Sequence, residues 1–184
     1  MPFHIQLLQT KEEMLPHLEV LQFLYPSLTA EQYAQELDLM LPHQYGQLAV
    51  FDAAKCVAIC GFWLGNKLWI GKYLELDNIV VDPACRSRGV GELIFQTLEQ
   101  KAKDENCNML ALDSYTSNFK AHKFFYNQGF GPKGFHFIKL LNEKAVRWAL
   151  LFRLIGWGCT EEGSTLSIRC RVLMSFCGQI SFGI

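Results

Sequence analysis

Residues 82–91 read Asp-Pro-Ala-Cys-Arg-Ser-Arg-Gly-Val-Gly, and every other segment of the chain is best interpreted outward from them. A strongly apolar segment, 74–81, precedes them and predicts a strand, and an amphipathic segment, 92–106, follows and predicts a helix. The first amides of a helix have no intrahelical partner and carry partial positive charge. We therefore expect a strand, a basic glycine-containing turn and a helix start to form a site for a pyrophosphate.

The predicted ligands of the phosphates are the residues of the turn itself: Arg86, Ser87, Arg88, Gly89, Val90 and Gly91. The two glycines lack the Cβ atom that would keep a phosphate away from the backbone amides. The two arginines add fixed positive charge and forked hydrogen-bond donors. The flanking strand, glycines and helix favour this interpretation over a solvated basic turn.

Two common phosphate-binding patterns do not fit the turn. The dinucleotide fingerprint G-x-G-x-x-G fails because Ile94 stands at its third glycine, and the Walker pattern fails because no Gly-Lys-Ser/Thr follows. The pattern that matches is Arg-x-x-Gly-x-Gly, formed by Arg86, Gly89 and Gly91 with Val-Asp-Pro just upstream. This resembles the acetyl-CoA-binding motif of the GNAT N-acetyltransferase superfamily.

A second segment carries the same resemblance. Asn118 is followed by Ala121, by Phe-Phe-Tyr at 124–126 and by Gly-Phe at 129–130. This order resembles the family's Asn-x-x-Ala-x-x-Phe-Tyr-x-x-x-Gly-Phe segment. The two motifs are correctly spaced around a predicted strand, and the resemblance covers roughly residues 3–141.

The resemblance implies an α/β (α+β mixed) fold, with a mixed β-sheet, flanking helices and two central parallel strands that splay apart to admit the pantetheine arm of acetyl-CoA. It implies that backbone amides at Ile79, Val80 and Val81 polarise the thioester carbonyl. It also implies that Asn118 holds the cosubstrate arm and that Phe125 lies at the same site.

Hydrophobic periodicity predicts the order strand, two helices, three strands, helix, strand, helix, strand. The expected strands are 3–8, 47–51, 57–64, 74–81, 109–113 and 135–141, and the expected helices are 11–25, 31–40, 92–106 and 118–128. Pro16 should shorten or kink the first helix, and Gly65 to Lys67 reads as a turn. The strands on either side of the crossover helix should be parallel neighbours.

Glu75 and Asp77 are the candidate general bases. They are two residues apart on a predicted strand and so share one face of the sheet. The histone-acetylating branch of the family carries its base at the position of Glu75. Asp77 is the alternative base, either carboxylate could attract a cationic substrate, and Asp113 could join them. The competing interpretation is a pair of solvent-facing charges.

The candidate proton donor for the departing thiolate is Tyr126. The tyrosine of the family falls at Phe125 here, which has no proton to give, and Tyr126 is rotated by about 100° around the helix. Solvent is the alternative donor. His122 is expected on the helix surface, and Cys85 has no paired histidine that would make it an acyl-accepting nucleophile.

The leading interpretation is an acetyl-CoA-dependent N-acetyltransferase that acts by direct attack in a ternary complex on a small-molecule or peptide amine. The alternative is a CoA-binding module without transfer activity, acting as a sensor or a partner-binding subunit, and a third interpretation is transfer of longer acyl groups. Five aromatic residues are expected to wall the acceptor site: Tyr25, Tyr33, Tyr45, Phe135 and Phe137.

Composition narrows the partners and the compartment. The net charge of −1 offers no field for a nucleic-acid backbone. Seven scattered cysteines fit neither a disulfide framework nor a metal site, and no signal peptide precedes the first strand, so a cytoplasmic protein is expected. Residues 142–184 form an extension of unknown role beyond the predicted domain 1–141. Its apolar segment is too short and too charged for a membrane span and favours packing on the domain or on a second copy. Adhesion to a membrane surface and a tail that is not a well-folded extension are the alternatives.

Overall fold

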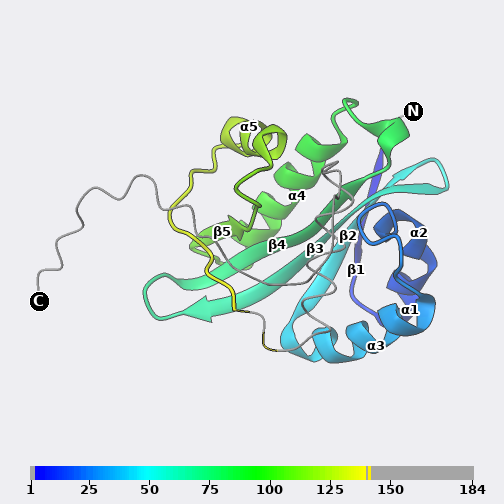
Figure 1. Ribbon diagram of the computed structural model, residues 1–184, viewed down its shortest axis with the longest axis horizontal. Helices are drawn as coiled ribbons and strands as arrows, with labels where there is room; N and C mark the ends of the chain where they lie inside the picture. Colours follow the sequence, from blue (N-terminus) through cyan, green and yellow to red (C-terminus); the bar gives the residue numbers. More distant parts are fainter. Residues whose placement is uncertain (1–2, 140, 142–184) are drawn as a thin grey trace, which may run out of the picture. The chain divides into compact units, whose positions relative to one another are not determined.

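The computed structural model describes residues 3–139 and residue 141 (Figure 1). The chain divides into two compact units, Met1–His136 and Phe137–Ile184, and all the described helices and strands lie in the first. The predicted extension 142–184 lies outside the described residues. The boundary at residue 141 and the role of the extension therefore stay predictions.

A five-stranded mixed sheet forms the centre of the first unit, with the strands in the order β1-β2-β3-β4-β5 (Figure 1). The strands are β1 (His4–Leu8), β2 (Tyr45–Asp52), β3 (Lys55–Lys67), β4 (Gly71–Val81) and β5 (Met109–Leu112). The pairs from β1 to β4 are antiparallel, whereas β4 and β5 are parallel. The predicted parallel neighbours are thus confirmed.

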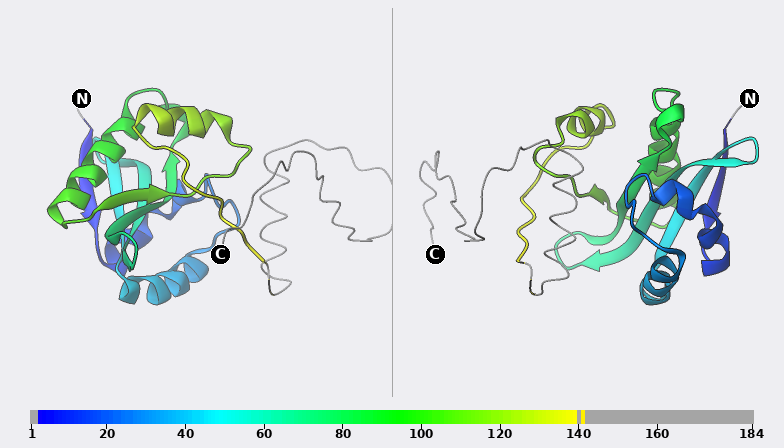
Figure 2. Two further views of the ribbon diagram at one scale, coloured as in Figure 1. Left: turned by 90° about the vertical axis from the view of Figure 1, so that its left-hand side faces the viewer. Right: turned by 45° about the vertical axis from the view of Figure 1, so that its right-hand side comes forward.

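Helices cover both faces of the sheet (Figure 2). The α-helices are α1 (Lys11–Met14), α2 (Leu18–Leu21), α3 (Ala30–Met40), α4 (Val90–Asp104) and α5 (Phe119–Asn127), and the 3₁₀ helices are η1 (Leu15–His17), η2 (Leu41–His43) and η3 (Pro83–Cys85). The first three α-helices pack on one face, and α4 and α5 pack on the other. The predicted break at Pro16 is confirmed, because Pro16 lies in η1 between α1 and α2.

The core has two layers, one on each side of the sheet. On the α4 side, Leu74 and Leu76 of β4 pack against Ile94 and Leu98. The other layer holds buried residues of α1 to α3 together with Val80 of β4. Regular alternation would place positions 74, 76 and 80 on the same face, so β4 must change face between 76 and 80.

A β-bulge at Asn78 causes this change of face. The register of β4 with β3 moves from Asp77 opposite Gly61 to Val80 opposite Ile59, so three steps along β4 match two along β3. Asn78 has a φ of 51°, a left-handed value that asparagine tolerates better than most residues. The bulge leaves Glu75 and Asp77 on the face of α1 to α3.

Two sequence-based expectations were wrong. Residues 135–139 form no strand: Phe135 is 79% exposed, and the Gly-Pro-Lys-Gly segment at 131–134 keeps the chain out of the sheet ladder. The turn expected at Gly65 to Lys67 is instead part of β3. A Cβ on Gly65 would lie 2.7 Å from a ring atom of Tyr73, so this glycine accommodates a cross-strand ring rather than a turn.

Candidate active site

The basic turn between β4 and α4 has an unusual backbone. Asp82 caps η3, its Oδ1 accepting a hydrogen bond from the amide of Ala84 at 2.9 Å. Ser87 and Gly89 then have φ values of 60° and 82°, both left-handed, and α4 begins at the next residue. A Cβ built on Gly89 would meet nothing within 4 Å, so open space lies at the start of α4. This geometry fits an anionic group at the first amides of the helix.

The two arginines of the turn have different surroundings. Arg86 is exposed, and its only hydrogen bond within residues 3–139 runs from Nε to the carbonyl of Val81 at 3.4 Å. The Nη1 of Arg88 instead lies 2.9 Å from Oδ2 of Asp52, and its guanidinium lies 4.9 Å from the ring centre of Phe3. The guanidinium of Arg86 therefore faces solvent, whereas that of Arg88 is joined to the β2–β3 hairpin and to the start of β1.

Gly91 is constrained by packing between helices. A Cβ at this position would lie 3.1 Å from Cζ of Phe124 on α5. Phe124 also meets Phe95 of α4 edge-on, with 5.2 Å between the ring centres. Gly91 thus permits α5 to approach α4, a constraint that the motif alone did not reveal.

The parallel strands pair over only part of β4. The pairing runs from Tyr73 opposite Met109 to Leu76 opposite Leu112, and β4 then continues to Val81. Among the described residues, no strand pairs with Ile79, Val80 or Val81 on the β5 side. The splay expected between the two central strands is confirmed. It leaves the backbone of Ile79 to Val81 without a strand on the β5 side, and this is the edge that the resemblance assigned to the thioester.

The predicted carboxylates lie beside an indole on the opposite face from α4. Trp63 of β3 lies directly across from Glu75, and its Nε1 donates to Oδ2 of Asp77 at 3.2 Å. The carboxylate of Glu75 is half-buried and has no hydrogen-bond partner in the part of the chain that the structure describes. The two carboxylates therefore differ: one is fixed by a donor, and the other is available to an amine or a water.

Buried polar groups support this face from below. Tyr33 donates to Oε1 of Gln47 at 3.0 Å, and Nε2 of Gln47 donates to the hydroxyl of Tyr45 at 3.0 Å. Burial raises the pKa of Tyr33 to about 12 and also raises the pKa of Tyr45. Both phenols stay neutral near pH 7, and they support the site rather than line it. The ring of Tyr45 lies 4.8 Å from that of Trp63.

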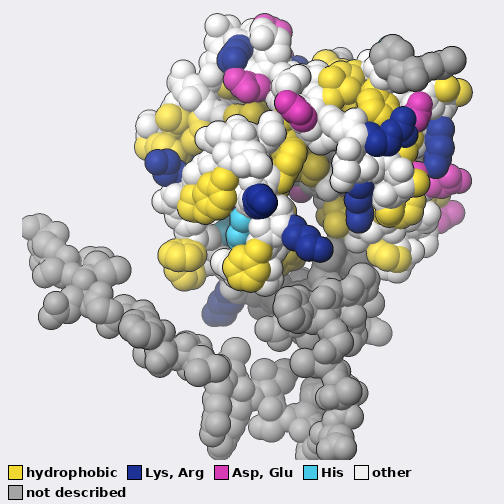
Figure 3. Space-filling model, turned by 90° about the horizontal axis from the view of Figure 1, so that it is seen from above, with side chains coloured by type: hydrophobic (Ala, Val, Ile, Leu, Met, Phe, Trp, Pro, Cys, Tyr) yellow, Lys and Arg dark blue, Asp and Glu magenta, His cyan; other side chains and the backbone are white. Residues whose placement is uncertain are grey.

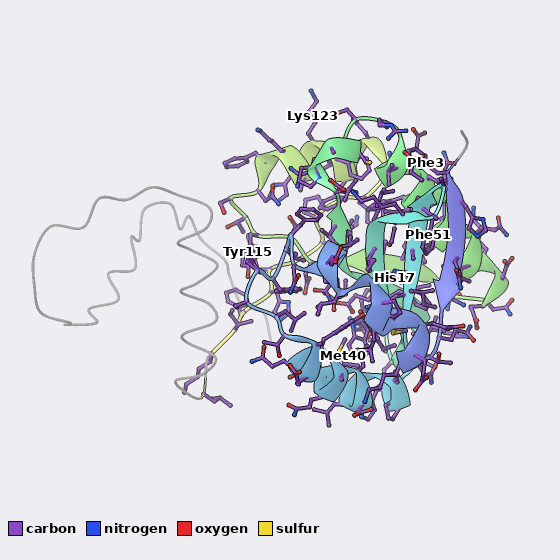
Figure 4. All side chains as sticks on the ribbon, turned by 90° about the vertical axis from the view of Figure 1, so that its right-hand side faces the viewer. Phe3, His17, Met40, Phe51, Tyr115 and Lys123 are labelled. Atoms are coloured by element: carbon purple, nitrogen blue, oxygen red, sulfur yellow. The ribbon has the colours of Figure 1, made fainter. Side chains whose placement is uncertain are left out.

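Tyr25, in the loop between α2 and α3, reaches the bulge. Its hydroxyl donates to Oδ1 of Asn78, and burial, followed by the charge of Asp77, raises its pKa to about 12. Tyr115, in the loop before α5 and labelled in Figure 4, also raises the pKa of the Tyr25 hydroxyl by its charge. Loops from both sides of the sheet therefore converge near Asp77.

Phe125, at the position of the family's tyrosine, and Tyr126, the candidate proton donor, point in different directions on α5. Phe125 packs towards α4, with its ring centre 5.9 Å from that of Phe95, whereas Tyr126 is 57% exposed. Asn118 caps α5, its Oδ1 accepting a hydrogen bond from the amide of Ala121 at 3.3 Å.

Seen from above, hydrophobic side chains lie among lysines and arginines over this part of the molecule (Figure 3).

Sequence reasoning missed Trp63 and Asn78. Trp63 was expected within a strand, but its position opposite Glu75 depends on the register of two strands, which periodicity does not give. An asparagine inside an apolar strand was a usable signal of a bulge. The expected aromatic wall also changes: Tyr33 and Tyr45 are buried beneath it, and Phe135 and Phe137 are exposed.

A splayed parallel pair and a basic turn at a helix start, joined by a bulged central strand, are arranged as the resemblance predicted for an acetyl-CoA-dependent acyltransferase. Residues 12–130 match the model of the Acetyltransferase (GNAT) family, and the chain belongs to this family. It is therefore an acetyl-CoA-dependent N-acetyltransferase. None of the helices in the described part of the chain is long and apolar enough to cross a membrane.

Curated and solved relatives match about three quarters of this chain. An uncharacterized N-acetyltransferase of Bacillus subtilis is 25% identical over 138 residues, which are 74% of this chain and 97% of that protein. Glucosamine-6-phosphate N-acetyltransferase from Arabidopsis thaliana has a TM-score of 0.63 at 19% identity, covering 77% of this chain and all of that one. The aminoglycoside N-acetyltransferase AAC(6')-Iy in complex with CoA has a TM-score of 0.65 at 15% identity, covering 78% and 97%. The two solved structures show likeness of fold.

Proposed function

We propose that this protein transfers the acetyl group of acetyl-CoA to a primary amine of a small molecule by direct attack in a ternary complex. The observation that carries the proposal is the position of the bulge in β4. Before Asn78, β4 presents Glu75 and Asp77 to one face; after it, β4 offers an unpaired edge at Ile79–Val81 and leads into the basic turn. One strand thus brings together the amine side, the thioester and the phosphates.

The turn fits the pyrophosphate of acetyl-CoA. Open space lies in front of Gly89, and the guanidinium of Arg86 is exposed beside it. We assign the backbone amides of 87–91 and Arg86 to the phosphates, and the edge at Ile79–Val81 to the acyl arm. Asn118 would hold the arm from the start of α5. The apolar and basic surface around α5 is suited to contact with the nucleotide part (Figure 3).

The nitrogen loses two protons in the reaction and the sulfur gains one. A simple alkylamine has a pKa near 10.4, so only about one molecule in 10³ is neutral near pH 7, and the ammonium form must first give a proton to a carboxylate. The neutral nitrogen then attacks the thioester carbon, a C–N bond forms, and the C–S bond breaks with its electron pair leaving on sulfur. The nitrogen loses its second proton to solvent as the amide forms, and the thiolate gains a proton from Tyr126 or from solvent.

Glu75 is the proposed base, and it acts through water. It lies four residues before Ile79, with the bulge at Asn78 between them, and is therefore the more distant of the two carboxylates from an amine at the thioester. Asp77 lies only two residues before Ile79. Because Trp63 fixes its carboxylate, Asp77 is suited to orient the cationic amine.

The acceptor we propose is a small amine with an apolar body. The half-buried rings of Trp63 and Tyr25 flank Asp77, and aromatic faces bind both cations and apolar groups. Two named neighbours of the fold act on small-molecule amines, although on polar sugars: the Arabidopsis protein is a glucosamine-6-phosphate N-acetyltransferase, and AAC(6')-Iy is an aminoglycoside N-acetyltransferase.

Release of free CoA thiol tests the proposal. The full-length protein is incubated with acetyl-CoA and a panel of primary amines, and the rate without amine measures plain hydrolysis. We expect amine-dependent thiol release, with the acetylated amine found by mass spectrometry. Tight binding of acetyl-CoA with no thiol release for any amine would instead favour a CoA-binding module. Faster thiol release from longer acyl-CoA thioesters would show that the preferred donor is a longer acyl group.

A further inference from the structure

The β2–β3 hairpin is joined to both ends of the basic turn by ion pairs. At the start of the turn, Nζ of Lys55 lies 2.7 Å from Oδ2 of Asp82. Near its end, Nη1 of Arg88 lies 2.9 Å from Oδ2 of Asp52. Asp52 and Lys55 face each other across the hairpin, so one short connection holds two points of the turn that are six residues apart.

The two ion pairs have opposite polarity. The hairpin supplies a carboxylate to the arginine and an ammonium to the aspartate, so it adds no net charge beside the phosphate site. Asp82 is only 5% exposed, and a buried carboxylate without a counterion would oppose an anion at the turn. The hydrogen bond from Lys55, more than any other cause, holds the pKa of Asp82 below its usual range.

Arg88 also contacts the start of β1. Its guanidinium lies over the ring of Phe3 at 4.9 Å, and Figure 4 shows Phe3 at the same end of the molecule as the loop before α4. Nη1 donates to Sγ of Cys85 at 3.5 Å as well. The guanidinium of Arg88 thus contacts protein at one edge and one face, although its side chain is still 46% exposed, whereas Arg86 donates to the carbonyl of Val81.

We propose that Asp52 and Lys55 are positioning residues for acetyl-CoA, which hold the turn in its binding conformation through Arg88 and Asp82. The inference rests on the proposed binding of acetyl-CoA at this turn. The left-handed φ of Ser87 is costly for a residue with a side chain, and Gly89 loses chain freedom in the turn, so ordering the turn in advance spares these costs on binding. In this proposal Arg88 holds the conformation of the turn, and Arg86 is the arginine that binds the phosphates.

The proposal predicts an effect opposite in sign to simple electrostatics. Removing the charge of Asp52 takes a negative group away from a site for a polyanion and frees Arg88, which by Coulomb's law alone should tighten binding. If Asp52 instead positions the turn, Asp52→Asn weakens binding. The sign of the change therefore separates positioning from direct charge effects.

The test is a calorimetric titration of CoA into the full-length protein and its variants Asp52→Asn, Arg88→Gln and the double variant. Asp38→Asn is the matched control, because Asp38 forms an exposed ion pair of 2.7 Å with Lys11 on α1 and lies away from the turn. We expect each single variant to raise the Kd of CoA by about three- to tenfold, the size that couplings between touching charged side chains reach. The double variant should be no worse than either single one, and the control should match the wild type.

Steady-state kinetics and melting provide the second readout. With a working amine, Asp52→Asn should raise the KM for acetyl-CoA and leave kcat at saturation unchanged, with a melting temperature close to that of Asp38→Asn. Tighter or unchanged CoA binding in Asp52→Asn, with weaker binding in Arg88→Gln, would overturn the inference and make Arg88 a direct ligand. Failure of the wild-type protein to bind CoA would overturn the proposed function itself, which is a distinguishable result.

Discussion

The turn at 82–91 and the face around Asp77 are built in different ways. The turn is one continuous segment with its own capping residue and left-handed residues at 87 and 89, and two ion pairs join it to the β2–β3 hairpin. The face around Asp77 is assembled from Trp63 of β3, two carboxylates of β4 and Tyr25 of the α2–α3 loop. In the proposed function, a continuous motif binds acetyl-CoA, and side chains from several elements contact the amine.

This difference implies that the two substrates respond to different substitutions. Changes in the turn should alter the affinity for acetyl-CoA, and changes at Trp63 or Asp77 should alter the use of the amine. Glu75 should affect the chemical step that joins them. A substitution that moved both affinities together would show that the two regions are coupled.

The largest effect is expected at Glu75. Glu75→Gln should lower kcat by about 10²–10⁴-fold near pH 7, the usual contribution of a general base. Activity should recover partly as the pH rises towards the pKa of the amine, near 10.4, because the amine then loses its proton unaided. A loss that is independent of pH would show that Glu75 only positions the substrate. Asp77→Asn is the matched comparison, and it should act mainly on the KM of the amine.

The next largest effect is expected for a substitution at Gly89. Gly89→Val should raise the Kd of acetyl-CoA by about tenfold or more, because a left-handed φ costs a side chain roughly 1–2 kcal/mol and the new methyls enter open space at the helix start. Gly91→Val should lower the melting temperature more, because its side chain meets Phe124. Calorimetry and thermal melting distinguish the two, and equal effects of both variants on affinity and melting would contradict the assignment.

Trp63→Phe should have a smaller effect that is confined to the amine. It keeps an aromatic ring and removes only the indole donor to Asp77, which corresponds to about three- to tenfold in the KM of the amine for one hydrogen bond. The KM for acetyl-CoA should not change. If that constant changes as well, the face around Asp77 also shapes the cosubstrate site.

Tyr126→Phe should reduce turnover by much less than the ~10²-fold of a buried general acid, because water can replace an exposed phenol. Phe125→Tyr should then add little, since its ring packs against Phe95. Single-turnover rates would check both. A large gain in Phe125→Tyr with a silent Tyr126→Phe would show that the chain works without its own proton donor.

The smallest effect is the pH dependence of stability at Asp82. Its lowered pKa means that the paired carboxylate stabilises the fold above its ordinary pKa near 3.9 and loses this contribution as the pH falls through the folded value. Asp82→Asn should therefore melt below the wild type between pH 5 and 7, and the gap should close below about pH 4. Lys55→Gln should show the same pH dependence of its melting temperature. If the difference in melting temperature between Asp82→Asn and the wild type persisted at lower pH, it would arise from the hydrogen bond of Asp82 to the amide of Ala84 rather than from the ion pair.

The contrast between the regions also explains what could be predicted from sequence. The parallel strands, the crossover helix and the turn followed from local apolar periodicity and the two glycines. Trp63 opposite Glu75 and the bulge at Asn78 depend on pairing between strands, which a one-residue slip would change. The strand expected at 135–141 shows the same limit, because alternation alone does not supply a sheet edge for it to join.

A crystal structure of the full-length protein with CoA tests the central claim most directly. We expect the pyrophosphate to accept hydrogen bonds from the backbone amides of 87–91 and from Arg86, with Arg88 still joined to Asp52 and the thiol beside the edge at Ile79–Val81. CoA bound away from the turn, or bound there with its thiol remote from the bulge at Asn78, would contradict the account.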